Sequence, residues 1–329
     1  MNVNDIIVQI KKINEDTVFI NKRARYLHRI KAFLFSVFKF IILLGISYII
    51  LGPLLIIISN SFFSPTDVYN PSVFLFPLDA TLGNYIMSFA RLEYFKTLGY
   101  SLAYIGVITI IQVMVCSMAG YGFARFDFPF KGFLFGCVIL TVVIPTHTIM
   151  LPLYQHFRNF DVFGIFNAVL GHKISLLSTE APMILMTIFG CGLRAGLFIY
   201  IFRQFFRGLP KEIEEAAFID GAGMFYTYFR IMLVNAIPSV ITVTVFSMVW
   251  QYNDIFYSSL FSMPVTHNIT FRLSTLQASI TNLDLIKDPN ISQLYVYSGL
   301  ILVLLPILLI YLALQKYFME GVERSGIVG

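Results

Sequence analysis

The sequence predicts an all-α membrane protein with six transmembrane helices. Of its 329 residues, 57% are hydrophobic and 12% are charged, and the mean hydropathy is +0.78. Soluble domains carry about 25% charged residues, so this composition excludes an ordinary soluble protein. Six apolar runs are also long enough to form helices across a hydrocarbon core. These predicted spans are residues 40–58, 100–123, 132–153, 182–202, 238–250 with a few residues before them, and 295–317.

A polar and basic segment, residues 1–32, precedes the first span. We expect no cleavable signal here, because the basic stretch is long and the apolar run after it is a full span. Isoleucines at positions 6, 7, 10 and 13 favour a short amphipathic helix, either on the inner membrane surface or in solution. No second domain boundary is visible, so residues 33–329 are expected to form one six-helix domain.

The middle spans contain small residues and prolines in characteristic places. The second span ends in the run AGYGFAR at residues 119–125, whose small residues allow helices to approach closely. Pro145 and Pro152 interrupt the third span, and the residue before a proline is disfavoured in a helix. The fourth span is expected to be one helix, although it contains Gly190, Gly192 and Arg194.

The polar stretch between the fourth and fifth spans, residues 209–222, has the sequence LPKEIEEAAFIDGA and the features of a short helix with a defined end. Pro210 suits the first helical position, where its missing N–H costs nothing. Three glutamates follow, where the helix dipole favours negative charge. Gly221 can adopt the left-handed conformation that ends a helix. A second amphipathic run at residues 225–233 completes a helix–turn–helix.

The distribution of lysine and arginine predicts the orientation of the chain. With six spans both termini lie on one side, and a cytoplasmic N-terminus places sixteen of the 23 basic residues in inner segments. Arg194 falls within a span, and six fall outside: Arg91, Lys96, Arg158, Lys173, Arg272 and Lys287. Positive charge concentrates on the cytoplasmic side of membrane proteins. Both termini and the 209–222 stretch are therefore predicted to be cytoplasmic.

The same stretch resembles a known family motif. Its matching positions are Glu215-Ala216-Ala217, Asp220-Gly221-Ala222, Phe229, Ile231 and Pro238. This pattern resembles the EAA loop in the permease subunits of ABC importers, and the RQFF run at 203–206 resembles the maltose-type branch, which imports carbohydrates. Val234 differs from the family, which usually has proline there. The resemblance covers roughly residue 80 to the C-terminus.

The resemblance implies a type I ABC importer permease in a bacterial cell membrane, with a cytoplasmic coupling helix in a loop at about 203–230. The residues expected to couple to an ATPase are Glu215, Ala216, Ala217, Asp220, Gly221 and Ala222. Expected partners are a second permease subunit, two cytoplasmic ATPase subunits, an extracellular or periplasmic solute-binding protein, a carbohydrate and the lipid bilayer. ATP and Mg²⁺ are expected on the ATPase partners, and no cofactor is expected in this chain.

Five residues are candidates for lining the substrate path. Arg194 lies within a predicted span, where a cation usually faces a cavity or a carboxylate; alternatively it lies near the outer interface. An aromatic and amide cluster closes the fifth span and suits sugar faces and hydroxyls, although interfacial aromatics are common without a ligand. The cluster consists of Trp250, Tyr252, Asn253 and Asp254.

Several functions are disfavoured by what the sequence lacks. The chain has no G-x-x-x-x-G-K-[ST] phosphate loop, so ATP hydrolysis is expected elsewhere. Its three cysteines and five histidines show no metal-site spacing, no catalytic motif is visible, and the basic residues follow membrane orientation rather than nucleic-acid binding. The alternatives to a sugar importer are an ABC permease for a non-sugar solute such as a polyamine or peptide, a stand-alone secondary transporter or channel, and an intramembrane enzyme.

Overall fold

The computed structural model describes the backbone of residues 3–326 and the side chains of residues 31–313 and 315. Within these residues the secondary structure is helical, apart from an isolated antiparallel bridge between Phe160 and Ile174. The chain divides into two compact units, Met1–Ser59 and Asn60–Gly329. Nearly all side chains of the predicted basic tail, residues 1–32, lie outside the described residues, so its predicted role stays a prediction.

The first unit is dominated by one long helix, α1 (Val3–Asn60). Its portion Lys31–Asn60 is long and apolar enough to cross a membrane, and it contains the predicted first span. Pro53 lies inside the helix without ending it. Prolines are tolerated in membrane helices because neighbouring groups can satisfy the backbone carbonyl that a proline leaves unpaired.

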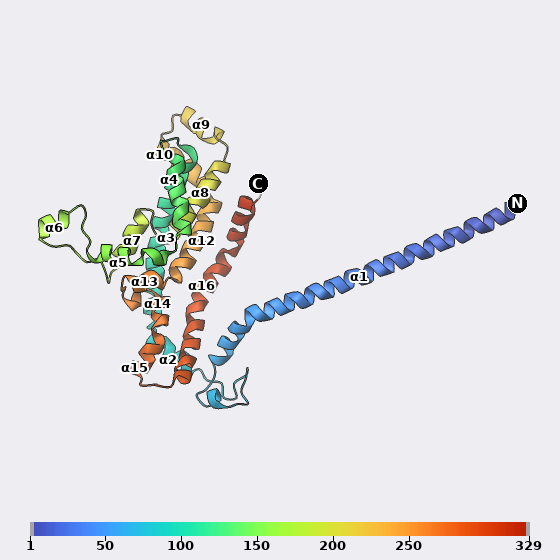
Figure 1. The fold of residues 1–329 in the computed structure, drawn as a ribbon, viewed down its shortest axis with the longest axis horizontal. Helices are drawn as coiled ribbons and strands as arrows, with labels where there is room; N and C mark the ends of the chain where they lie inside the picture. Colours follow the sequence, from blue (N-terminus) through green and yellow to red (C-terminus); the bar gives the residue numbers. More distant parts are fainter. Residues whose placement is uncertain (1–2, 327–329) are drawn as a thin grey trace. The chain divides into compact units, whose positions relative to one another are not determined.

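The second unit is a helical bundle with α9 and α10 at one end and α2 and α15 at the other (Figure 1). Its α-helices are α2 (Gly83–Arg91), α3 (Tyr94–Arg125), α4 (Lys131–Val143), α5 (Met150–Arg158), α6 (Ile165–Leu170), α7 (Ala181–Ile188), α8 (Ala195–Gly208), α9 (Glu212–Ile219), α10 (Met224–Tyr226), α11 (Leu233–Asn235), α12 (Ile237–Tyr252), α13 (Phe256–Leu260), α14 (Ile269–Ser274), α15 (Leu276–Leu283) and α16 (Pro289–Gly326). Short 3₁₀ segments are η1 (Asp67–Tyr69), η2 (Thr146–Ile149) and η4 (Val265–His267), and η3 (Thr227–Met232) is a π-helical turn.

Three helices in the described residues are individually long and apolar enough to cross a membrane, namely Lys31–Asn60, Tyr94–Arg125 and Pro289–Ala313. Two further pairs pass the same test together but are bent. Lys131–Val143 and Thr146–Arg158 meet at 100°, and Met224–Asn235 and Ile237–Tyr252 meet at 77°. Five of the six predicted spans therefore correspond to a continuous helix or a bent pair.

The fourth predicted span, residues 182–202, is not one helix, so that prediction was wrong. The helix α7 ends at Ile188 and α8 begins at Ala195. Between them Gly190 has φ +71° and Arg194 has φ +61°. Glycine adopts this left-handed conformation freely, but it is uncommon for arginine. The apolar run thus contains a turn that its hydropathy does not reveal.

The bend in the third span lies where its first proline predicts. The residue before Pro145, Ile144, is extended, with φ −66° and ψ 123°, so α4 ends at Val143. Steric conflict with the proline ring drives this conformation. Pro152 lies in the first turn of α5, where a missing N–H is harmless.

The core forms where α3 packs on α8. A Cβ added at Gly120 would lie 2.6 Å from the Cβ of Phe202 and 2.9 Å from the backbone nitrogen of Arg203. Only glycine permits this approach, as the small residues of the second span predict. Around the crossing, Phe198, Phe202 and Phe206 are fully buried. These contacts pack α8 closely against α3.

Candidate functional site

The predicted short helix with a glycine stop is present. It is α9, and its end is closed by two backbone hydrogen bonds, from Gly221 N–H to the Phe218 carbonyl (3.0 Å) and from Ala222 N–H to the Ala217 carbonyl (3.0 Å). With φ +83° at Gly221, this pattern is a Schellman motif. One detail differs from the prediction, because Pro210 precedes the helix by two residues and does not occupy its first position.

A buried carboxylate anchors α9 to α3, and it belongs to Glu214. Oε2 of Glu214 lies 2.8 Å from Nε of Arg125, and both side chains are about nine-tenths buried. The Nε–H group is not aligned for a hydrogen bond, so this contact is an ion pair. The Tyr121 hydroxyl donates to Oε1 of Glu214 over 2.6 Å. Nη2 of Arg125 donates to the Leu209 carbonyl (2.8 Å), so the arginine also holds the turn before α9.

The residues predicted to couple to an ATPase are divided between two sides of α9. The side chains of Glu215, Ala216 and Asp220 are exposed, whereas Ala217 is buried. The Glu215 carboxylate makes no hydrogen bond or ion pair with the residues whose side chains are described. Sequence reasoning missed Glu214 as the anchoring carboxylate. Its position three residues before Ala217 places both on one helical face, and that spacing could have indicated it.

Exposed apolar side chains lie beside Glu215 on α9 and on the neighbouring helix α10. Phe218 is 47% exposed, Ile219 85% and Phe225 70%. Their elements, α9 and α10, lie together at one end of the second unit (Figure 1). Exposed apolar residues that cluster beside charged ones mark surfaces that contact another protein or a membrane.

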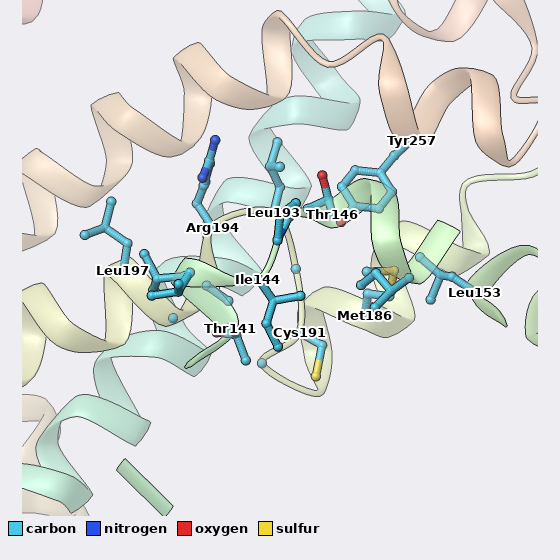
Figure 2. A pocket seen from close by; sticks show the side chains of 18 of the residues that line it. Thr141, Ile144, Thr146, Leu153, Met186, Cys191, Leu193, Arg194, Leu197 and Tyr257 are labelled. Carbon is cyan, nitrogen blue, oxygen red and sulfur yellow. The ribbon is translucent and has the colours of Figure 1, made fainter. Parts of the chain in front are cut away.

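A cavity of about 620 Å³ lies between the turn that joins α4 to α5 and the turn that joins α7 to α8. Its walls come from the turn between α4 and α5, the turn between α7 and α8, and Tyr257 of α13, as Figure 2 shows. Its polar groups include Thr146, His147 and Arg194. Irregular backbone at membrane depth is tolerated where it lines a cavity or is buried in protein. Both helix breaks thus line the same cavity.

The structure brings together two of the five predicted substrate-path residues. Arg194 lines the cavity, and its guanidinium carbon lies 5.6 Å from the centre of the Trp250 ring. The indole does not line the cavity itself; it is half-buried and packs on Phe198 and Phe246. Arg194 is thus positioned by a cation–π contact with the end of α12.

The other three predicted residues do not reach the cavity. The Tyr252 hydroxyl is buried and donates to the Val303 carbonyl (2.6 Å). Asn253 donates back to the Val249 carbonyl (2.8 Å). Asp254 accepts the backbone N–H groups of Tyr257 and Ser258, and burial raises its pKa despite these hydrogen bonds. Within this chain their contacts are structural, and Tyr257, Thr146 and His147 line the cavity instead.

A buried polar group links the cavity wall to two helices. Nε2 of Gln112, on α3, donates to the Leu193 carbonyl at 2.6 Å. Its Oε1 accepts from the hydroxyl of Ser247 (3.0 Å) and the amide of Gln251 (3.3 Å), both on α12. A buried amide is costly unless hydrogen-bonded, and this one is well satisfied. Gln112 therefore fixes the backbone beside Arg194.

Among the residues with described side chains, no group of three or more His, Cys, Asp or Glu is arranged to hold a metal ion. Cys116 is buried, whereas Cys137 and Cys191 are exposed, and all three are free thiols. The polar groups that could meet a solute in this chain are therefore those of the cavity and of the exposed ends.

The fold is similar to the crystal structure of a bacterial ABC transporter involved in the import of the acidic polysaccharide alginate. It matches with a TM-score of 0.64 and 21% identity, over 87% of this chain and 96% of that chain. At this identity the likeness supports the fold alone. It agrees with the predicted permease-like helical bundle.

Relatives of known family extend the comparison. The "Probable ABC transporter permease protein PH1036" of Pyrococcus horikoshii is 30% identical over 255 residues, covering 75% of this chain and 81% of the relative. The "Arabinooligosaccharides transport system permease protein AraQ" of Halalkalibacterium halodurans is 28% identical, covering 86% and 93%. The "Melibiose/raffinose/stachyose import permease protein MelC" of Bacillus subtilis is 26% identical, covering 78% and 85%.

Residues 112–324 match the family described as "Binding-protein-dependent transport system inner membrane component". The match includes α8, α9, the cavity and the Arg125–Glu214 ion pair. It covers more than half of the chain and agrees with the relatives above. The chain therefore belongs to the family of inner membrane components of binding-protein-dependent transport systems, as the resemblance of its polar loop predicts.

Proposed function

We propose that this chain forms one half of the membrane pathway of an ABC importer for a carbohydrate. Family membership supports a transport subunit that works with other proteins, which argues against a stand-alone transporter. Relatives that match over most of their length are named for arabino-oligosaccharides and for melibiose, raffinose and stachyose. These names favour a sugar over the alternative of a polyamine or a peptide.

A role of α9 in coupling to a partner protein is supported by one observation: one side of the helix is bonded to α3 and the other side is exposed. The Arg125–Glu214 ion pair and the Tyr121 hydrogen bond hold the helix to α3. Its opposite side presents Glu215 and apolar groups to another protein. A helix fixed in this way can transmit the movement of a docked partner. We propose that the partner is a cytoplasmic ATPase and that contact is made through residues 209–222.

The proposed topology has six spans in a bacterial cell membrane. The sixth span, beyond the three continuous helices and two bent pairs, consists of α7 and α8 with the turn between them. Both termini and α9 then lie in the cytoplasm, as the basic residues predict. A second permease subunit completes the pathway, two ATPase subunits supply ATP and Mg²⁺ chemistry, and an external solute-binding protein delivers the sugar.

The proposed mechanism is alternating access driven from α9. The helix α8 has fourteen residues and so spans about 21 Å, running from Arg194 at the cavity to the turn before α9. Because α8 is packed tightly on α3 at Gly120, the two helices move as a unit. A displacement of α9 toward closed ATPases would therefore shift the turn that carries Arg194. ATP on the ATPase subunits and sugar in the cavity would then each favour one of the same two positions of α8 and α9, as coupling requires.

The co-purifying proteins test this function directly. The tagged chain, extracted gently from its native membrane, is expected to retain a P-loop ATPase and a second permease, identified by mass spectrometry. A co-purifying binding protein can then be screened with neutral and acidic sugars. A chain that emerges alone or as a homo-oligomer, even after mild cross-linking, would contradict the proposed assembly.

Glu215→Gln is expected to lower the initial rate of sugar uptake about tenfold, because a charge-assisted hydrogen bond to the ATPase contributes about 1.5–3 kcal/mol. Glu212→Gln removes another exposed carboxylate from the same helix, one that is not among the six residues expected to couple, and is expected to retain uptake. Uptake is measured in proteoliposomes, with membrane insertion checked by surface labelling. Equal uptake in both variants and the wild type would remove Glu215 from the coupling contact.

Gly221→Val is expected to abolish uptake while the protein still inserts, because a β-branched residue at φ +83° costs about 1–2 kcal/mol and opens the end of α9. Gly221→Asn is the matched control, since asparagine tolerates the left-handed region. We expect it to keep most of the transport rate. Normal uptake by the valine variant would show that the Schellman turn is unimportant for coupling.

A further inference from the structure

We propose that the cavity between the two interrupted spans binds the carboxylate of an acidic sugar, with Arg194 as its partner. This inference rests on the proposed carbohydrate transport and narrows it to uronic acids. It is carried by three features of the cavity: its charge, the unpaired state of Arg194, and the helix end from which Arg194 projects. Figure 2 shows Arg194, Thr146 and Tyr257 among the lining side chains.

The charge of the cavity has one sign. Among the nineteen described residues that line it, Arg194 carries the charge and no aspartate or glutamate is present. Most of the remaining wall is apolar, including Val142, Ile144 and Leu193. Arg194 itself is exposed, so an anion that enters the cavity can reach its guanidinium group.

Arg194 has no carboxylate partner among the residues whose side chains are described. Elsewhere in the second unit, Arg91 pairs with Asp284, Arg125 with Glu214, and Arg272 with Glu93. The Arg194 guanidinium lies over the face of Trp250. Stacking on a ring leaves the N–H groups in the guanidinium plane free to donate. Their fork matches both oxygens of a carboxylate.

The backbone adds to this positive field. Arg194 is the residue before the first turn of α8, and residues 195–197 of that turn also line the cavity. The start of a helix of this length carries a partial positive charge. Gln112 holds the neighbouring Leu193 carbonyl, which fixes the turn. Guanidinium and helix end thus act on the same space.

The remaining polar groups suit the rest of a sugar. Thr146 and Tyr257 contribute hydroxyls, and His147 contributes an imidazole. These groups donate and accept hydrogen bonds and carry no fixed negative charge. The volume of about 620 Å³ lies within the range of about 300–1,000 Å³ that is typical of ligand pockets. A monoanionic saccharide satisfies both the single cation and the hydroxyl groups.

The test uses the intact, nucleotide-free complex in lipid nanodiscs, titrated calorimetrically with three matched pairs of disaccharides. Each pair consists of a neutral disaccharide and the same disaccharide with uronic acid units. The three pairs are built from galactose, mannose and glucose, respectively. We expect at least one uronic form to bind more tightly than its neutral counterpart. Arg194→Gln is expected to weaken that binding about 10- to 100-fold, the range for a lost hydrogen bond to a charged group. Arg194→Lys is expected to retain part of the affinity.

Arg203→Gln is the matched control. Arg203 also lies over an aromatic ring, that of Phe135, with its guanidinium carbon 3.8 Å from the ring centre, but it does not line the cavity. Its replacement removes the same charge and is expected to leave the affinity unchanged. Trp250, the single tryptophan of the chain, gives a local readout. The chain is labelled with 5-fluorotryptophan, and the ¹⁹F signal of Trp250 is identified by its loss in Trp250→Phe. This signal is expected to shift when the uronic sugar binds to the wild type, and to stay unchanged in Arg194→Gln.

Three results would overturn the proposal. If neutral sugars bind better, or if Arg194→Gln binds uronic sugars normally, the carboxylate site is wrong while sugar transport stands. If Arg194→Gln releases the second permease on gel filtration, the arginine serves assembly instead. If no sugar of either kind binds the complex or stimulates its ATPase with the binding protein present, the proposed carbohydrate function itself fails.

Discussion

Arg125→Met will destabilise the protein by about 3–5 kcal/mol and abolish uptake, because it leaves the Glu214 carboxylate buried without its counter-charge. It also removes the donor to the Leu209 carbonyl. The expected measurements are a lower apparent melting temperature of the purified complex and no sugar uptake in proteoliposomes. ATP hydrolysis by the partner subunits should persist but no longer respond to the binding protein.

The double variant Arg125→Met with Glu214→Met separates stability from coupling. Replacing both partners of a buried ion pair with apolar residues is often neutral or stabilising, so the melting temperature should recover. If the ion pair also fixes α9 for coupling, uptake will stay low in this stable protein. A double variant that is both stable and fully active would show that the pair has no role in transport. A single Arg125→Met variant with normal melting would contradict the burial argument itself.

Gly120→Val will separate α3 from α8, because even its Cβ would lie 2.6 Å from the Cβ of Phe202 and 2.9 Å from a backbone nitrogen. Backbone atoms cannot move aside as a side chain can, so the helices themselves must shift. Overpacking costs about 1–3 kcal/mol or more. We expect lower expression, a reduced melting temperature and loss of uptake, with Gly120→Ala milder in each.

Gly122→Ala, two residues along the same helix, is the matched control. Its added Cβ would meet Phe126 Cδ2 at 3.9 Å, an ordinary contact. It should fold and transport as the wild type does. Equal behaviour of the alanine variants at positions 120 and 122 would contradict the close approach of α3 and α8.

The sequence predicted features that depend on composition or on local backbone preference. Apolar runs indicated the three continuous apolar helices and the two bent pairs, Pro145 indicated a break, and Gly221 indicated the end of α9. Each of these depends on residues close together in the chain. The family motif, which is also local, predicted the family that residues 112–324 match.

The features that the sequence did not predict depend on distant contacts. Glu214 and Glu215 are adjacent and chemically identical, and Glu214 is the one that meets Arg125, 89 residues earlier, and Tyr121. The turn at residues 189–194 has the hydropathy of a helix, and its stability depends on Gln112 of α3. Tyr252 looked like a ligand group, but its hydroxyl donates to the carbonyl of Val303, 51 residues further along the chain.

The position of the cavity lining outside the long helices has a consequence for the evolution of such a protein. Thr146 begins the short 3₁₀ segment η2 and Arg194 precedes the first turn of α8, so both lie outside the long helices. Their side chains can change without interrupting α3 or α8, and the α9 end lies a full helix length away. Under the proposed function, solute preference can therefore change through these few residues while the α9 surface that we propose contacts the ATPase stays the same.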